Sequence, residues 1–270
     1  MAVSLLKNKY TIIFLTQIKN LLAYRMNIML KLVRPLLMTA AIAALWHVLF
    51  RIKGENNIGG FTYESFIIYL LTVRFIAVFS PGGASIQEMN EEIRTGNITM
   101  RLVRPMHYML WLFLRNLPVP LTSGVIGIAM VSILAYFWGA DVPTGYRSVL
   151  FFFSVIATVL IQYAFYQGIG ILSFWIYEIN SVERLYKSCS TLLSGEFVPL
   201  ALFGSGSLFL QFTPLAALAH IPGTIFTNNI ISLEMATWQV VSQYVWAIIM
   251  WSGLIKLYCM GLKKFEAQGG

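Results

Sequence analysis

Few side chains in this sequence have the type and spacing that catalysis or metal binding requires. The three histidines, His47, His107 and His220, are far apart and have no carboxylates at helical ligand spacing, so no metal site is predicted. No serine, histidine and aspartate arrangement stands out, and a nucleophile needs a partner base. We therefore predict neither a catalytic nor a metal site.

Nucleotide binding through a phosphate loop is excluded by the same reasoning. The pattern G-x-x-x-x-G-K-[ST], in which backbone amides and a lysine cradle the phosphates, occurs nowhere in the sequence. The pair Gly82-Gly83 lacks the lysine that such a loop needs. We therefore expect no cofactor in this chain.

Four polar residues stand inside apolar runs: Arg74, Gln162, Gln167 and Glu196. A charge in hydrocarbon is costly, and it usually finds a partner or a watery path. Arg74 and Glu196 could pair, although their depths at about 1.5 Å per residue favour separate roles. The two glutamines could line a polar path, whereas hydrogen bonds between helices are the more common role of such amides.

The longest strongly charged stretch runs over residues 85–105. Ser85 followed by Glu88 matches a capping box, so a helix is expected to begin at Ser85. Gly96 is well placed to end that helix. A short helix therefore stands between two runs long enough to cross a bilayer.

This short helix is predicted to be amphipathic. Ile86, Met89 and Ile93 fall at spacings of three and four on one face. The glutamates lie on other faces: Glu88, Glu91 and Glu92. The pattern fits a small helix at the membrane's edge and equally fits a solvated loop helix.

Composition indicates the class of protein. Of the 270 residues, 58% are hydrophobic and only 11% are charged, and a soluble domain of this length cannot bury so much apolar surface. Several apolar runs approach or exceed the roughly 20 residues that a helix needs to cross a bilayer, and they do not alternate as barrel strands would. We predict an all-α polytopic membrane protein with one domain over residues 1–270.

Neither the N-terminal residues nor the two cysteines indicate processing or a further site. Lys7 and Lys9 are not followed by a small-residue cleavage site, so we expect the chain to be inserted uncleaved. Cys189 and Cys259 indicate neither a disulfide framework nor a metal site.

Six transmembrane helices are predicted. Pro118 and Pro120 are expected to bend the third, and a short charged loop is expected over 177–187. The predicted spans cover residues 33–50, 61–80, 106–138, 148–176, 185–203 and 238–260.

Two further segments fit neither a span nor a simple loop. Residues 5–25 place Tyr10, Phe14 and Ile18 on one face, which favours an interfacial helix over the first part of a long, tilted first span. Residues 204–237 are apolar, interrupted by glycine and proline and free of Lys and Arg. Because broken backbone at membrane depth must be buried, we expect re-entrant or short interfacial helices there.

Positive charge predicts the orientation. With six spans, both termini and residues 85–105 lie on the same side of the membrane. Of the 19 Lys and Arg residues, 15 fall on that side. Arg51, Lys53 and Arg147 fall on the opposite side, and Arg74 is intramembrane. This bias predicts cytoplasmic termini.

Two motifs resemble those of the ABC-2 type permeases of ATP-binding cassette transporters. EIRTGNI at 92–98, followed by LVRP at 102–105, resembles the family's glutamate, isoleucine, glycine and leucine-x-x-proline pattern after the second span. SGEFVPL at 194–200, with Phe203 beyond, resembles its serine-glycine and proline-leucine pattern. Gly204 stands where a proline is usual, and TPL at 213–215 replaces the more familiar proline-phenylalanine.

The resemblance implies a function and a set of partners. It implies a permease subunit in a bacterial cytoplasmic membrane that exports a hydrophobic or amphipathic substrate. The subunit would dimerise with itself or with a sister permease, and separate ATPase subunits would hold ATP and Mg²⁺.

The resemblance also assigns roles to segments. Residues 85–95 would be a coupling helix that docks on the ATPase, within a coupling segment over 85–105. Residues 5–25 would be a connector helix, and residues 204–237 an extracellular re-entrant hairpin. The implied coupling residues are Ile86, Glu88, Met89, Glu91, Glu92, Ile93, Arg94 and Gly96.

Two other classes of protein compete with this interpretation. A stand-alone secondary transporter or channel would use Arg74, Glu196 and the two glutamines to carry ions, but the sequence has no inverted repeat and few intramembrane acids. A membrane-embedded enzyme or scaffold is the other alternative. Co-purification of an ATPase would distinguish the permease from both.

Overall fold

The computed structural model describes residues 11–19, 25–54, 57–81, 83–104, 106–140, 142–227 and 231–269. Within these ranges the chain is built from helices, and the sole β-type pairing is one isolated bridge between Ile58 and Phe61. Four of the described helical stretches are long and apolar enough to cross a membrane: Met29–Ile52, Tyr108–Phe137, Tyr146–Phe174 and Leu233–Phe265. The prediction of an all-α membrane protein is confirmed.

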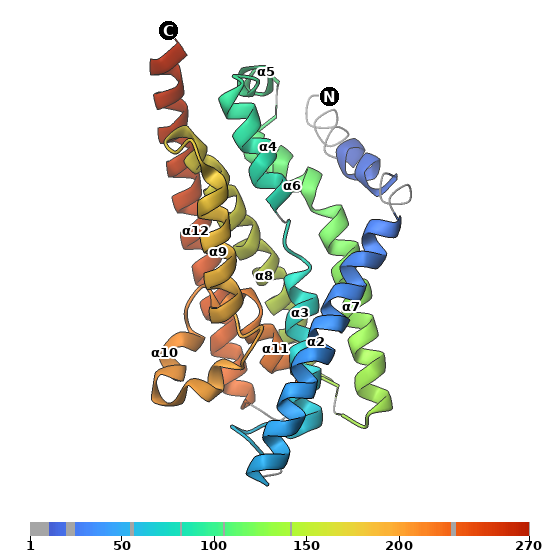
Figure 1. Cartoon of the computed structure of the whole chain (residues 1–270). Coiled ribbons are helices and arrows are strands. Elements are labelled where there is room, and N and C mark those ends of the chain that lie inside the picture. The colour runs from blue at the N-terminus through green and yellow to red at the C-terminus, as the bar shows by residue number, and fades with distance from the viewer. Residues whose placement is uncertain are drawn as a thin grey trace.

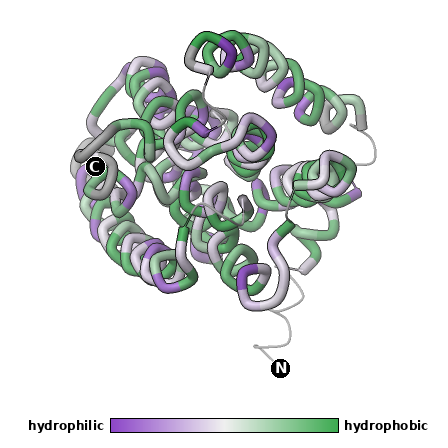
Figure 2. The backbone as a smooth tube through the Cα atoms, turned by 90° about the horizontal axis from the view of Figure 1, so that it is seen from below, coloured by the Kyte–Doolittle hydropathy of each residue, from purple (hydrophilic) through white to green (hydrophobic). Residues whose placement is uncertain are grey.

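Long helices form the frame of the bundle (Figure 1). They are α2 (Arg25–Lys53), α7 (Pro118–Phe137), α8 (Tyr146–Ile171) and α12 (Leu233–Gly269). Seen along the bundle, hydrophobic residues predominate on the helices (Figure 2). Leu37 on α2, Phe137 on α7 and Ile248 on α12 are exposed. Apolar surface on this scale is unfavourable in water, so these sides suit the apolar interior of a membrane.

The short helix α3 (Tyr63–Ala77) lies at the centre of the bundle. It packs against α2, α7 and α11 (His220–Phe226), and its residues from Phe66 to Ile76 are buried. Thr62 caps it, because its hydroxyl accepts a hydrogen bond from the Ser65 amide. At 15 residues, α3 is about 22 Å long, shorter than the roughly 30 Å hydrocarbon core.

The third predicted span is bent where the prolines stand. α6 (Tyr108–Asn116) ends just before Leu117, and α7 begins at Pro118. A proline lacks the amide hydrogen that an intrahelical bond needs, so it is tolerated at the start of α7 and not within a continuous helix. The predicted bend is confirmed.

The first, fourth and sixth predicted spans lie on α2, α8 and α12, and all three begin earlier than expected. α2 begins at Arg25 with Pro35 inside it, and α8 is extended by the turn η1 (Leu172–Phe174). α12 reaches Gly269, so this helix continues beyond the predicted end of the sixth span at residue 260.

The predicted loop over 177–187 is wrong. α9 (Ile179–Leu193) begins inside it, because Ile179, Val182 and Tyr186 recur at helical spacing and pack against α8. The bounds predicted for the fifth span, 185–203, are wrong for the same reason. α9 ends at Leu193, before Gly195, whose φ of +82° breaks the helix.

The region from residue 204 is broken into short helical pieces, as its glycines and prolines predict. These pieces are η2 (Leu200–Gly206), α10 (Ser207–Gln211), η3 (Ala216–Leu218) and α11. The predicted end at residue 237 is late, since α12 begins at Leu233. α11 is wholly buried, and Thr158 of α8 and Gln243 of α12 donate hydrogen bonds to the Ala217 carbonyl at 2.8 and 3.0 Å.

One end of the bundle collects several segments. α4 (Gly83–Arg94), α5 (Ile98–Leu102), helical residues 11–19 and the C-terminal part of α12 all lie toward this end (Figure 1). We call it the α4 end. The rest of the predicted interfacial helix over 5–25 lies outside the described residues, apart from Arg25, which begins α2.

Close contact between α7 and α3 yields a first prediction. A Cβ on Gly127 would collide with the Phe75 ring and would also lie 3.0 Å from Phe75 Cβ, which rotation of the ring cannot relieve. Gly127→Ala is therefore expected to lower the thermal midpoint of the detergent-purified protein, because overpacking typically costs about 1–3 kcal/mol.

Gly253→Ala is the matched control. Gly253 lies inside α12, and a Cβ there would meet no atom within 4 Å. Alanine gains about 1 kcal/mol of helix propensity at such a position, so the midpoint should stay or rise. A midpoint that rises equally in both variants would contradict the close α3–α7 contact.

Candidate functional site

The charged stretch after α3 forms α4, which begins at Gly83 rather than at Ser85. Ser85 is the third residue of the helix and is buried, so the predicted capping box is wrong. A Cβ on Gly83 would collide with the Glu183 carboxylate of α9. The glycine thus allows the first turn of α4 to lie directly against α9. This turn begins two residues before Ser85, the predicted cap.

The apolar face of α4 packs against the chain's own core. Ile86 belongs to a buried cluster with Ile169 and Ile179, while Met89 and Ile93 belong to a second cluster that includes Phe174. A Cβ on Gly170 of α8 would lie only 2.7 Å from Met89 Sδ, which shows how closely α4 approaches α8.

This packing limits which side of α4 is open to another subunit. Ile86, Met89 and Ile93 are all buried within the chain, so this face is not available for another subunit to press on. Their helical spacing predicted an apolar face correctly, but that face packs against the rest of the same chain. A part for these residues in transmitting force stays a prediction.

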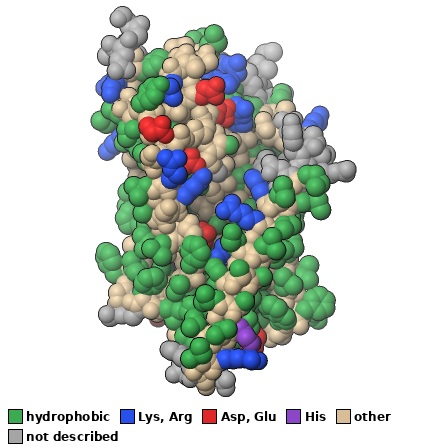
Figure 3. All heavy atoms as spheres, in the orientation of Figure 1, with side chains coloured by type: hydrophobic (Ala, Val, Ile, Leu, Met, Phe, Trp, Pro, Cys, Tyr) green, Lys and Arg blue, Asp and Glu red, His purple; other side chains and the backbone are tan. Residues whose placement is uncertain are grey.

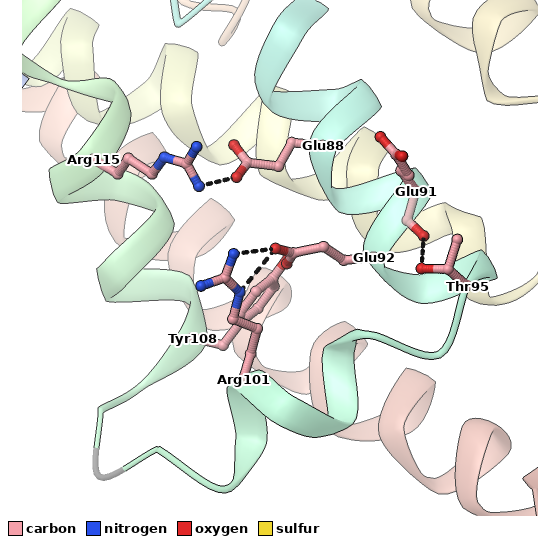
Figure 4. A network of polar contacts seen from close by, with 7 residues as sticks. All are labelled: Glu88, Glu91, Glu92, Thr95, Arg101, Tyr108 and Arg115. Atoms are coloured by element: carbon pink, nitrogen blue, oxygen red, sulfur yellow. Dashed lines mark hydrogen bonds and ion pairs between the residues drawn. The ribbon is translucent and has the colours of Figure 1, made fainter. Parts of the chain in front are cut away.

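Glu92 fixes α4 to the two segments that follow it. Its carboxylate accepts hydrogen bonds from Arg101 Nε at 2.8 Å and from the Tyr108 hydroxyl at 2.7 Å, and Arg101 Nη2 completes an ion pair at 2.8 Å (Figure 4). The residue is only 9% exposed. Because a buried carboxylate needs such partners, α4, α5 and α6 are held as one unit.

A second ion pair joins α4 to α6. Glu88 pairs with Arg115, and the two side chains point toward each other in Figure 4. The guanidinium groups of Arg101 and Arg115 lie over the Trp111 ring, 4.3 and 5.0 Å from its centroid. Burial raises the pKa of the Glu88 carboxyl and Arg115 opposes that shift, so acid weakens this link sooner than it would an exposed pair.

The other flank of α4 is tied to α9 and to the residues before it. Gln87 Nε2 donates to Asn180 Oδ1 at 2.5 Å and to Glu183 Oε2 at 3.1 Å. The Arg94 guanidinium lies 3.9 Å from the centroid of the Tyr177 ring and donates to its hydroxyl. α4 therefore links α5 and α6 on one side with α8 and α9 on the other.

The outer surface of this unit is exposed. Glu91 and Arg94 are exposed on α4, and beyond it Met100 is 71% and Val103 86% exposed. Gly96, with φ of +75°, makes the turn that ends α4, as predicted. Pro105, the last residue of the predicted segment, lies outside the described residues.

A cavity of about 830 Å³ lies beside α4. Its walls include Asn90, Glu91 and Arg94 of α4 together with Tyr177 and Phe265. Asn90 is buried, and its Oδ1 has no hydrogen-bond partner among the described residues. The exposed surface around α4 is thus hollowed, and the walls of the hollow are both polar and apolar.

The two intramembrane glutamines join helices. Gln162 Nε2 donates to the Leu218 carbonyl at 3.2 Å, and Gln167 Nε2 donates to the Met109 carbonyl at 3.3 Å. Both are hydrogen bonds between elements, which is the commoner of the two roles considered for these amides. Gln162 also lines a cavity of about 100 Å³ that Glu196 shares.

Arg74 and Glu196 share a cavity of about 410 Å³ but form no ion pair with each other, and both lie in the described part of the chain. The Arg74 guanidinium lies 5.5 Å from the centroid of the Phe197 ring, and Glu196 accepts a hydrogen bond from Ser194 at 3.4 Å.

The three histidines lie apart, each beside a tyrosine. His220 Nδ1 is 2.7 Å from the Tyr69 hydroxyl, His47 lies against Tyr63, and His107 lies against Tyr258. Among the described residues, no group of three or more His, Cys, Asp or Glu side chains could hold a metal ion. Cys189 and Cys259 are free and exposed.

Comparison with known families gives a match over most of the chain. The family model described as ABC-2 family transporter protein matches residues 36–269. The chain belongs to the ABC-2 transporter family. No curated protein matches it. Membership implies the permease of an ABC transporter, a transmembrane subunit without an ATPase site of its own that works with ATPase partners.

Sequence reasoning missed the partners of the glutamates in this ABC-2 permease. Arg101 and Tyr108 reach Glu92 only because the chain turns at Gly96 and comes back along α4. Arg115 offered one usable signal: a cation inside the apolar segment 106–117 requires an acidic partner, and Glu88 supplies it.

The Glu92 network yields a second prediction. Glu92→Gln is expected to speed amide exchange over residues 97–104 by about 10-fold or more, because a hydrogen bond to a charged group contributes roughly 1.5–3 kcal/mol. Hydrogen–deuterium exchange of the purified permease measures this directly.

Glu91→Gln is the matched control, since Glu91 is the adjacent α4 residue and is exposed. Its exchange pattern should match that of the unaltered protein. Equal exchange over 97–104 in the Glu92 variant and this control would contradict the proposed role of Glu92 in holding α5.

Proposed function

We propose that this chain is the permease subunit of an exporter driven by ATP hydrolysis on separate ATPase subunits. One observation carries the proposal: α4 is bonded on both flanks to the permease, while its outer surface and the residues after it stay exposed. A segment of this kind can receive a push from another subunit and pass it to both halves of the bundle. The ATPase subunits would hold ATP and Mg²⁺.

In this proposal the ATPase docks on the exposed surface around Glu91, Arg94, Met100 and Val103. Closure of the ATPases then moves α4 without compressing it, because its apolar face is already packed on α8. Contacts of Glu88 and Glu92 carry the movement to α5 and α6, and α6 leads into α7. Gln87 carries it to α9 and Arg94 to Tyr177, while the apolar face of α4 carries it to α8. The assembly then switches between two arrangements.

We further propose a six-span topology with both termini and the α4 end in the cytoplasm of a bacterial cytoplasmic membrane. α3 and α9 would complete the spans together with the adjoining non-helical residues, since each is too short alone. The helix at 11–19 would lie along the membrane, and the broken region up to α12 would be re-entrant on the outer side. Residues 1–270 would form one permease domain.

The substrate proposed is hydrophobic or amphipathic, and the functional unit is a dimer of this chain or a pair with a sister permease. The exposed apolar side of α2 supports both parts of this proposal. Within the most apolar 18-residue stretch of α2 only 11% of the residues are buried. This helix is therefore free to contact a second permease or a lipid-like molecule.

Isolation of the native complex tests this function. The tagged chain, extracted from its own membrane in mild detergent, should retain an ABC ATPase in stoichiometric amount, with ATP hydrolysis in the eluate. Thr99→Glu, which adds charge to the exposed surface of α5, should reduce the retained ATPase about tenfold, as one or two lost interface contacts would.

Thr144→Glu is the matched control, because Thr144 is an exposed threonine in the loop between α7 and α8, at the far end of the bundle. It should retain the ATPase fully. A chain that purifies alone, without ATP hydrolysis, would contradict the proposal and favour a gradient-driven transporter.

A further inference from the structure

The cavity shared by Arg74 and Glu196 is rich in positive charge. It has a volume of about 410 Å³ and is bounded by α2, α3, α8 and α9 and the residues after α9. Its lining contains one acid, Glu196, and four cations: Lys31, Arg34, Arg74 and Lys187. On the face between α9 and α2, Lys and Arg side chains gather around a hollow (Figure 3).

Internal pairing does not neutralise this charge. Lys187 pairs with Glu183, and Glu196 is the sole remaining acid in the lining. Lys31, Arg34 and Arg74 therefore face one carboxylate, and no ion pair joins any of these three to an acid among the described residues. The cavity keeps an excess of two positive charges.

Arg74 is the residue that most needs a partner. It is only 8% exposed, and its Nε and Nη2 atoms have no hydrogen-bond partner in the described part of the chain. A buried guanidinium with unmatched donors is costly, and its planar fork fits the paired oxygens of a phosphate. Arg74 lies in the last turn of α3 and lines the cavity, so its guanidinium group borders the space that a ligand would fill.

The remaining walls suit an amphipathic molecule. Pro35, Met38 and Phe197 line the cavity with apolar surface, while Ser80 and Thr191 add hydroxyl groups. α2, which forms one wall, is exposed along its apolar side. A headgroup could therefore reach the cations while its hydrocarbon part stays beside α2.

We propose that this cavity binds the phosphate headgroup of an anionic membrane amphiphile, with Arg74 as the central contact and Lys31 and Arg34 beside it. The phosphate oxygens would accept hydrogen bonds from the Arg74 guanidinium and neutralise the excess charge. The inference does not depend on ATP-driven export, because lipid binding can be measured on the purified chain without an ATPase.

Native mass spectrometry of the purified full-length protein, titrated with phosphatidylglycerol, tests the proposal. The expected result is saturable retention of one phosphatidylglycerol per chain in preference to zwitterionic phosphatidylcholine. Arg74→Gln should weaken retention about 10-fold or more, as expected for lost hydrogen bonds to a charged group. Arg34→Gln, at an exposed position where folding is not at risk, should weaken it about threefold to fivefold.

Arg51→Gln is the matched control for Arg34→Gln, since both residues are exposed arginines of α2 and only Arg34 lines the cavity. Its affinity for phosphatidylglycerol should not change. Equal retention by the Arg34 and Arg51 variants would overturn the site. Displacement of phosphatidylglycerol by inorganic phosphate at equal concentration would overturn the amphiphile and assign the cavity to free phosphate.

Discussion

The arrangement around α4 depends on one buried carboxylate. Glu92 is held by Arg101 and Tyr108, and a carboxylate this far from water is stable only with such partners. Those partners bring α5 and the start of α6 against α4. The apolar face of the helix packs on the bundle: Ile86 is buried in a cluster with residues of α8 and α9, and Met89 in a cluster with residues of α6, α8 and α12.

A helix fixed in this way can transmit a movement to the helices that it contacts, and a loosely attached loop helix cannot. Force applied to the exposed surface reaches α6 through the Glu88–Arg115 ion pair and the Glu92–Tyr108 hydrogen bond. It reaches α9 through Gln87, so the two sides of the bundle respond together. The central helix α3 leads directly into α4 and is enclosed by α2, α7 and α11. In the proposed transport cycle, movement of α4 would therefore also displace the helix that carries Arg74.

The sequence predicted local features of this site better than its contacts. The end of α4 at Gly96, the bend before Pro118 and the broken region before α12 all depend on glycine or proline, whose backbone constraints act locally. The predicted start of α4 at Ser85 is two residues late, and the sequence gives no sign that Gly83 lies against Glu183, 100 residues away. The spacing of Ile86 and Met89 defines an apolar face but carries no information on what covers it. Family resemblance supplied the docking role, and packing shows which face of α4 is buried.

The central claim is that α4 and α9 move as one body during the ATP cycle, and a reversible cross-link tests it most directly. Cysteines at Gln87 and Asn180, whose side chains are 2.5 Å apart, can be bridged by a short methanethiosulfonate linker after Cys189 and Cys259 are replaced by serine. We predict that ATP hydrolysis by the bridged permease–ATPase complex equals that of the reduced complex, because the bridge joins parts that never separate. Hydrolysis that stops on bridging and recovers on reduction would show that α4 moves away from α9, and would contradict the account.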